Sequence, residues 1–171
     1  ARYTLERPER VNNLVLLSAS GAPVKEESSP PMALRAMKNP FGRFLISRIW
    51  SRSMAKKSLE DMVFDGSSIT DEEIDRMWDF SIYPGNMDAM FQEFRETWAA
   101  FDPADIKEIT TNTLLIWGKE DSICPESMGI WYDSHLPNST MVVIPNIGHN
   151  PHFECPNRCS DEISSWLAAL T

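Results

Sequence analysis

Three short apolar runs, each followed by a turn or loop, most constrain what this chain can fold into. They are VNNLVLLSASG, with its apolar core from Leu14 to Leu17, ITTNTLLIWGKED, with its core from Thr113 to Trp117, and TMVVIPNIGH. Continuous apolar runs of this length suit strands that are buried on both faces of a parallel sheet. Segments with helical periodicity alternate with these strands, so the sequence predicts an α/β fold made of parallel strand–helix–strand units.

The longest helical stretch lies between the first two predicted strands. FGRFLISRIWSRSMAKKS repeats apolar residues at helical spacing, and ITDEEIDRMWDFSIY begins with Thr70 three residues before Glu73, which is a capping-box pattern. GNMDAMFQEFRETWAAF places several methionine and aromatic residues on one face. Two further helices are predicted later in the chain, one with Pro125 in its first turn and one capped by Ser160.

The composition excludes several classes of protein. The 171 residues carry 16 basic and 25 acidic side chains, a net charge of -9, which argues against a nucleic-acid binder because phosphate contacts need clustered Lys and Arg. No apolar run approaches the length of a membrane span. The three cysteines are too few and odd in number for a disulfide scaffold, so we expect reduced thiols and a cytoplasmic protein.

Two candidate catalytic residues follow the second and third predicted strands. Asp121 lies in WGKEDSICP and His149 in NIGHNP. The carboxyl ends of parallel strands meet at one edge of a sheet, where open α/β sheets bind their ligands. A carboxylate and an imidazole there can meet, with Asp121 holding the ring tautomer and His149 acting as the base.

These segments carry a resemblance to a known family. RYTLERPERVNNLVLLSASG, LLIWGKEDSICP and VVIPNIGHNPHFECPNRC resemble, in this order, the C-terminal half of an α/β-hydrolase. The resemblance implies a partial α/β-hydrolase fold with the last three parallel strands, in which Asp121 is the triad acid and His149 the triad base. It divides the chain into a core of residues 1–23 and 105–171 and a helical cap, or lid, of residues 24–104.

The predicted cap carries the candidate substrate-binding residues. A methionine and aromatic stripe is usually core packing, but it can line a pocket where helices cover an active site. The substrate suggested by such a stripe is a mainly apolar small molecule. The candidates are Trp78, Met87, Met90, Phe91, Phe94 and Trp98, with His152 as a residue of the pocket rim or of the packing.

One part of the family pattern is absent from these residues. The family nucleophile sits in G-x-S-x-G, yet the seven glycines stand at 21, 42, 66, 85, 118, 129 and 148, with no two of them four apart. We therefore interpret the chain as a fragment whose missing N-terminal half supplies the nucleophile and the oxyanion hole. Such a fragment should be inactive alone and should expose a sheet edge.

The resemblance implies hydrolysis of an ester, a carbon–carbon bond next to a carbonyl, a halide or an epoxide, without a cofactor or metal. A serine nucleophile would favour acyl transfer, whereas an aspartate would favour dehalogenation or epoxide opening. Ser18, Ser20 and Cys124 are the candidate replacement nucleophiles within the chain, and each is better explained as a structural residue.

Two other functions remain open. The first is a hydrolase-like domain that only binds a ligand or a partner, which loss of the nucleophile turn would fit. The second is a small zinc-binding domain, because His149, His152, Cys155 and Cys159 form H-x2-H-x2-C-x3-C. Known zinc modules usually pair two ligand groups across a longer loop, and here the four donors lie within eleven residues.

Overall fold

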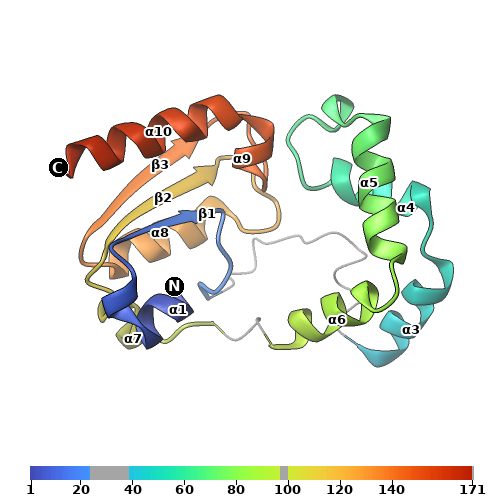
Figure 1. Cartoon of the computed structure of the whole chain (residues 1–171), viewed down its shortest axis with the longest axis horizontal. Coiled ribbons are helices and arrows are strands. Elements are labelled where there is room, and N and C mark those ends of the chain that lie inside the picture. Colours follow the sequence, from blue (N-terminus) through green and yellow to red (C-terminus); the bar gives the residue numbers. More distant parts are fainter. Residues whose placement is uncertain (24–38, 97–99, 171) are drawn as a thin grey trace.

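The computed structural model describes residues 1–23, 39–96 and 100–170, without the side chains of residues 93–96. Three parallel strands form its sheet in the order β1–β2–β3 (Figure 1). They are β1 (Asn13–Leu17), β2 (Asn112–Gly118) and β3 (Ser139–Ile144). The three predicted strands and the α/β class are thereby confirmed.

β2 forms the centre of the sheet and is buried along almost its whole length. Its register places Leu115 opposite Leu16 of β1 and Met141 of β3. β1 and β3 are only half-buried, since each has one neighbour among the described strands. The prediction that Leu14–Leu17 is buried on both faces is therefore wrong for β1, which is an outer strand here.

Alternation along β2 gives the sheet two apolar faces. Leu115 and Trp117 belong to one cluster, whereas Leu114 and Ile116 belong to the other. The first face packs against α8 (Glu126–His135), and the second packs against α10 (Pro156–Ala169) (Figure 1). Helices on both faces are what a buried parallel sheet requires.

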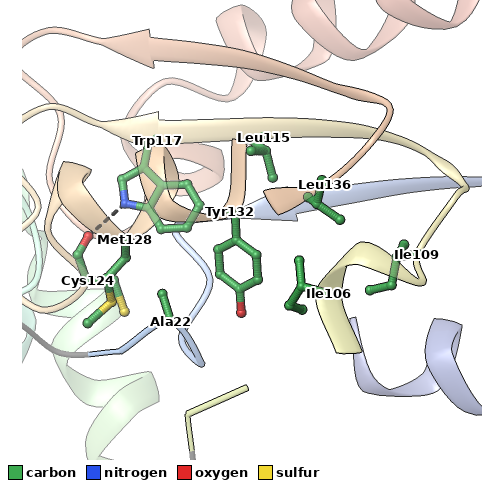
Figure 2. Packing of buried hydrophobic residues seen from close by; sticks show 9 residues of the cluster. All are labelled: Ala22, Ile106, Ile109, Leu115, Trp117, Cys124, Met128, Tyr132 and Leu136. Atoms are coloured by element: carbon green, nitrogen blue, oxygen red, sulfur yellow. Dashed lines mark hydrogen bonds between the residues drawn. The ribbon is translucent and has the colours of Figure 1, made fainter. Parts of the chain in front are cut away.

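The larger cluster surrounds Trp117 and Tyr132 (Figure 2). The Trp117 indole Nε1–H donates to the carbonyl of Cys124 at 2.7 Å, and the Tyr132 hydroxyl donates to the carbonyl of Ser20 at 2.7 Å. Both polar groups of these large rings are thus hydrogen-bonded inside the core, so that their burial carries no unpaired donor. The Trp117 bond also fixes the backbone of the loop that follows β2.

The middle of the chain is helical, as predicted. It contains α3 (Pro40–Ile49), α4 (Arg52–Glu60), a 3-10 turn η2 (Gly66–Ser68), α5 (Asp71–Ile82) and α6 (Asn86–Glu96). The capping box at Thr70 and Glu73 is confirmed, with both reciprocal bonds present. Asn39 and Ser51 cap α3 and α4 with one bond each, since their side chains accept the backbone N–H groups of Gly42 and Met54. Figure 1 shows these helices grouped on one side of the sheet.

The remaining helices are short and lie around the sheet. They are α1 (Arg2–Glu6), η1 (Pro8–Arg10), α7 (Pro103–Lys107) and α9 (Pro151–Glu154). Neither α7 nor α9 was predicted, because four or five residues are too few to show periodicity. The prediction that Ser160 caps the last helix is wrong, since α10 already begins at Pro156.

Candidate active site

Asp121 lies in the loop between β2 and α8, and its carboxylate is held from two sides. Its Oδ1 accepts the backbone N–H groups of Ile123 at 2.9 Å and Cys124 at 2.8 Å. The side chain is fully buried, with 0% of its surface exposed. Hydrogen bonds from backbone N–H groups stabilise a carboxylate in its charged form, which is what a buried anionic acid needs.

His149 lies in the loop after β3 and completes the pair. Its Nδ1 is 2.9 Å from Oδ2 of Asp121. Because the carboxylate accepts, Nδ1 carries the proton, and the neutral ring then has a lone pair on Nε2. A quarter of the side chain is exposed, in contrast to the buried carboxylate. The pair is therefore suited to accept a proton at Nε2 while Asp121 stabilises the resulting imidazolium.

The two loops meet because β2 and β3 are parallel neighbours whose carboxyl ends share one edge. Beyond this edge the backbone pairing continues, with Lys119 N–H donating to Ile144 at 3.0 Å and Glu120 N–H donating to Ile147 at 3.1 Å. Gly118 leaves the necessary space, since a Cβ there would lie 2.0 Å from the carbonyl oxygen of Gly148. The sequence predicted that Asp121 and His149 can meet, and the structure brings them together.

A segment of the helical region also contacts both loops. Residues 61–64 follow α4, and the carbonyl of Met62 accepts the backbone N–H of His149 at 2.8 Å. The Ser122 hydroxyl, beside Asp121, lies 3.5 Å from the carbonyl of Asp61. Glu154 binds the backbone N–H of Phe64 at 2.7 Å. Glu154 is the glutamate of the P-x-x-E-x-P-like stretch after His149 and was not among the predicted site residues, although its place between Pro151 and Pro156 was a usable signal.

The candidate substrate-binding residues are only partly brought together. Met87 and Met90 pack against the buried Phe91 in one cluster, which Ile123 of the Asp121 loop also joins. Trp78 is half-buried outside this cluster, and His152 is exposed on α9. Phe94 lies in α6, but its side chain and the whole of Trp98 fall outside the described residues. Ile123 was missed because nothing in its local pattern shows what packs on it.

The cysteines occupy apolar surroundings. Burial, followed by the nearby charge of Asp121, raises the pKa of Cys124 to about 12, so its thiol is neutral at pH 7 and a poor nucleophile. Cys155 Sγ and Cys159 Sγ lie 4.0 Å apart at the start of α10, and burial raises the pKa of Cys159 to about 12. Within the described ranges, no three potential ligands come together around a common point.

Ser18 stands out at the carboxyl end of β1. It has a positive φ of 43°, its side chain is buried, and its hydroxyl has no hydrogen-bond partner among the described residues. Its backbone N–H donates to the carbonyl of Ile116 at 3.0 Å. The hydroxyl thus makes no bond to the imidazole of His149, as a serine nucleophile activated by that base would.

Comparisons with known proteins identify the family. The family profile for the alpha/beta hydrolase fold matches residues 1–156, which is most of the chain. The chain belongs to the α/β-hydrolase family.

This α/β-hydrolase chain is 30% identical over 167 residues to the uncharacterized hydrolase YugF of Bacillus subtilis, covering 95% of the chain and 59% of YugF. It is 27% identical over 172 residues to a 2-hydroxymuconate semialdehyde hydrolase of Pseudomonas putida, covering 96% of the chain and 56% of that protein. The chain thus spans less than two thirds of the length of these relatives.

Solved structures show the same fold. A meta-cleavage product hydrolase from Pseudomonas fluorescens superimposes with a TM-score of 0.79 at 22% identity, covering 99% of the α/β-hydrolase chain and 60% of that protein. No helix in the described part of the chain is long and apolar enough to cross a membrane.

Proposed function

We propose that Asp121 and His149 are the acid and the base of a nucleophile–His–Asp triad that hydrolyses a small molecule. The observation that carries this proposal is the 2.9 Å contact between His149 Nδ1 and the fully buried Asp121 carboxylate. It sets the tautomer that leaves Nε2 as the base. His149 would take the proton of the nucleophile or of water and later return it to the leaving group, and Asp121 would stabilise the imidazolium.

The nucleophile and the oxyanion donors would come from residues outside this chain. None of the 171 residues forms a G-x-S-x-G turn, and Cys124 and Ser18 do not offer an activated nucleophile to His149. A base without these groups retains little catalysis, so we expect the chain alone to be inactive. The missing N-terminal half of the same protein is the partner we propose for it.

The substrate class follows from the relatives and from the helical region. Relatives named as hydrolases of 2-hydroxymuconate semialdehyde and of a meta-cleavage product favour a carbon–carbon bond next to a carbonyl over an ester, halide or epoxide. We propose that residues 24–104 form the cap over this site. The cluster of Met87, Met90 and Phe91 touches Ile123 beside Asp121, which supports an apolar part in the substrate. The cytoplasmic location stays a prediction.

The test begins with the DNA upstream of the codon for Ala1. An open frame that encodes G-x-S-x-G would identify the nucleophile as serine, and an aspartate in its place would point to halides or epoxides. In the longer protein, Asp121→Asn and His149→Ala should each lower kcat by about 10⁴-fold or more without unfolding the protein. Asp161→Asn, at an exposed position on α10, is the control and should retain full activity.

The alternative is a hydrolase-like module that binds without catalysis. A start codon and an upstream stop beside Ala1, together with a folded chain that turns over none of the four substrate classes, would favour it. Full activity in either Asp121→Asn or His149→Ala would remove these two residues from the catalytic site. The alternative zinc domain would require stoichiometric zinc that is lost when Cys155 and Cys159 are replaced.

A further inference from the structure

Glu154, the last residue of α9, binds three backbone N–H groups from two distant parts of the chain. Its Oε2 accepts from Phe64 at 2.7 Å and from Gly148 at 2.9 Å. Its Oε1 accepts from Asn150 at 3.1 Å and from Gly148 at 3.0 Å. One carboxylate therefore holds both neighbours of His149 and, at the same time, the 61–64 segment of the helical region.

The 61–64 segment and the His149 loop are also joined by contacts that do not involve Glu154. The backbone N–H of His149 donates to the carbonyl of Met62 at 2.8 Å. Gly148 lies flat against the segment, since a Cβ on it would be 2.8 Å from the nitrogen of Phe64 and from the carbonyl carbon of Val63. The three consecutive amides of residues 148–150 are thus all bonded, two to Glu154 and one to the segment.

The segment holds the His149 loop more firmly than it holds the Asp121 loop. Among the described residues, its one hydrogen bond to the Asp121 loop is the 3.5 Å contact from the Ser122 hydroxyl to the carbonyl of Asp61, which is at the outer limit for a hydrogen bond. Asp121 itself is fixed independently by the N–H groups of Ile123 and Cys124. A displacement of the segment would consequently move His149 relative to a stationary Asp121.

We propose that Glu154 is a positioning residue that couples the 61–64 segment to the ring of His149. This inference rests on the proposed function, because the ring that Glu154 positions belongs to the same His149–Asp121 pair. With Glu154 in place, the segment and the histidine loop move as one body, and the Nδ1–Asp121 bond is made. Without it, the segment and the loop are joined only by the His149–Met62 bond and by the packing of Gly148 among the contacts described above, and the ring loses its fixed approach to the carboxylate.

The coupling requires a carboxylate rather than an amide. Both oxygens of Glu154 accept hydrogen bonds, and each of them faces two N–H donors. A glutamine has the same shape but would direct its NH₂ group at one of the two donor pairs, where no acceptor is available. Glu154→Gln therefore separates the need for two acceptor oxygens from the need for side-chain volume.

Amide hydrogen exchange, measured by NMR on the 171-residue chain, tests the coupling directly. In Glu154→Ala the amides of Phe64, Gly148 and Asn150 should exchange about tenfold faster or more, since they lose their acceptor. The decisive amide is that of His149, which bonds to Met62 and not to Glu154. It should accelerate by a similar factor, and the ¹⁵N signature of the Nδ1-protonated ring should weaken in parallel.

Two further variants and two reference amides distinguish a local effect of Glu154 from a general loss of stability. Glu154→Gln should produce a smaller acceleration at His149, and Glu162→Gln, which alters an exposed pair with Arg158 on α10, should produce none. The amides of Leu115 and Ile116 in β2 should remain as protected as in the parent chain. If Glu154→Ala does not fold, the exchange rates of the His149 amide and of the β2 amides are compared in Glu154→Gln instead.

Two outcomes would overturn the coupling. In the first, the His149 amide keeps its protection while only the three partners of Glu154 lose theirs. In the second, β2 loses protection to the same extent as residues 148–150 in both variants. Neither outcome depends on catalysis, so the proposed function would stand or fall separately, through the activities of Asp121→Asn and His149→Ala.

Discussion

The sheet and the group of helices α3–α6 use their apolar residues in opposite ways. In β2, Leu115, Ile116 and Trp117 are completely buried between helices on the two faces of the sheet. In the helices, Phe41 is 74% exposed and Phe80 is 68% exposed, and Tyr83, directly after α5, is 66% exposed. An amphipathic pattern therefore led to a packed core only where a second layer covers the apolar face.

Among the described residues, the helical group contributes to two small clusters. One is built on Ile46 and Phe91, and the other on Val63, Ile69 and Ile74. Three of its helices, α3, α4 and α5, begin at side-chain caps, which act locally and need no tertiary partner. The comparison teaches that the sheet derives its stability from burial, whereas the helices depend to a greater degree on local signals. Four measurements would break or sharpen this contrast.

The largest effect is expected at Trp117, in the centre of the buried cluster. Trp117→Ala should lower the free energy of unfolding by about 4 kcal/mol, because it leaves a large cavity and frees the carbonyl of Cys124. Phe80→Ala, the matched removal of an exposed ring in α5, should cost less than about 0.5 kcal/mol. Urea unfolding of both variants checks the pair, and equal losses would contradict the contrast.

A pH-dependent effect is expected at Cys124 on the sheet side. Burial raises the pKa of its thiol from 9.0 to about 12, so the folded state retains the proton in a range where the unfolded chain loses it. The stability from this group is complete below about pH 9 and is lost as pH rises toward 12, by about 2 kcal/mol between pH 9 and pH 11. The free energy of unfolding of the parent, minus that of Cys124→Ala, should therefore fall by about 2 kcal/mol from pH 9 to pH 11.

A constant difference between these two proteins across the same range would show that Cys124 titrates normally and is not enclosed. The comparison with Cys124→Ala is needed because burial also raises the pKa of Tyr132 and of Cys159. Both groups remain in both proteins, so the contribution of Cys159 cancels in the difference, and that of Tyr132 cancels except for the smaller part of its raised pKa that comes from the charge of Cys124.

Much of the sheet and of the candidate site could be predicted because both follow from local patterns. The apolar runs at Leu14–Leu17 and Thr113–Trp117 each became a strand, and the rule that parallel strands end at one edge placed Asp121 near His149. The Thr70–Glu73 capping box is equally local, since its partners lie three residues apart. These features need no knowledge of what covers them.

The rest depended on contacts between distant segments. Glu154 is 90 residues from Phe64, and no periodicity shows that the loop after α4 returns to the histidine. The exposure of β1 has the same origin, since its local pattern is that of a buried strand and only the number of its neighbours differs. The exposed face of α3 likewise follows from which elements pack on it, not from its sequence.

A smaller effect is expected at the cap of α5. Thr70→Ala removes the side-chain acceptor for the Glu73 N–H and should cost about 1 kcal/mol. Ser53→Ala, an exposed hydroxyl inside α4, is the control and should change the free energy of unfolding by less than about 0.5 kcal/mol. Equal effects in thermal unfolding would show that α5 is stabilised by packing rather than by its cap.

The smallest effect is expected on the exposed face of α3. Phe41→Ser should change the free energy of unfolding by less than about 0.5 kcal/mol, because the ring is already 74% exposed. In the same helix, Ile46 is 5% exposed and packs on Phe91, so Ile46→Ser should cost several times more. Urea unfolding of the two variants compares the contributions of the exposed and the buried face of α3 to the free energy of unfolding. If Phe41→Ser instead lowered the free energy of unfolding by more than about 1 kcal/mol, this face would be covered in solution. The sheet and the helices would then differ in what covers each element rather than in how much apolar surface each one buries.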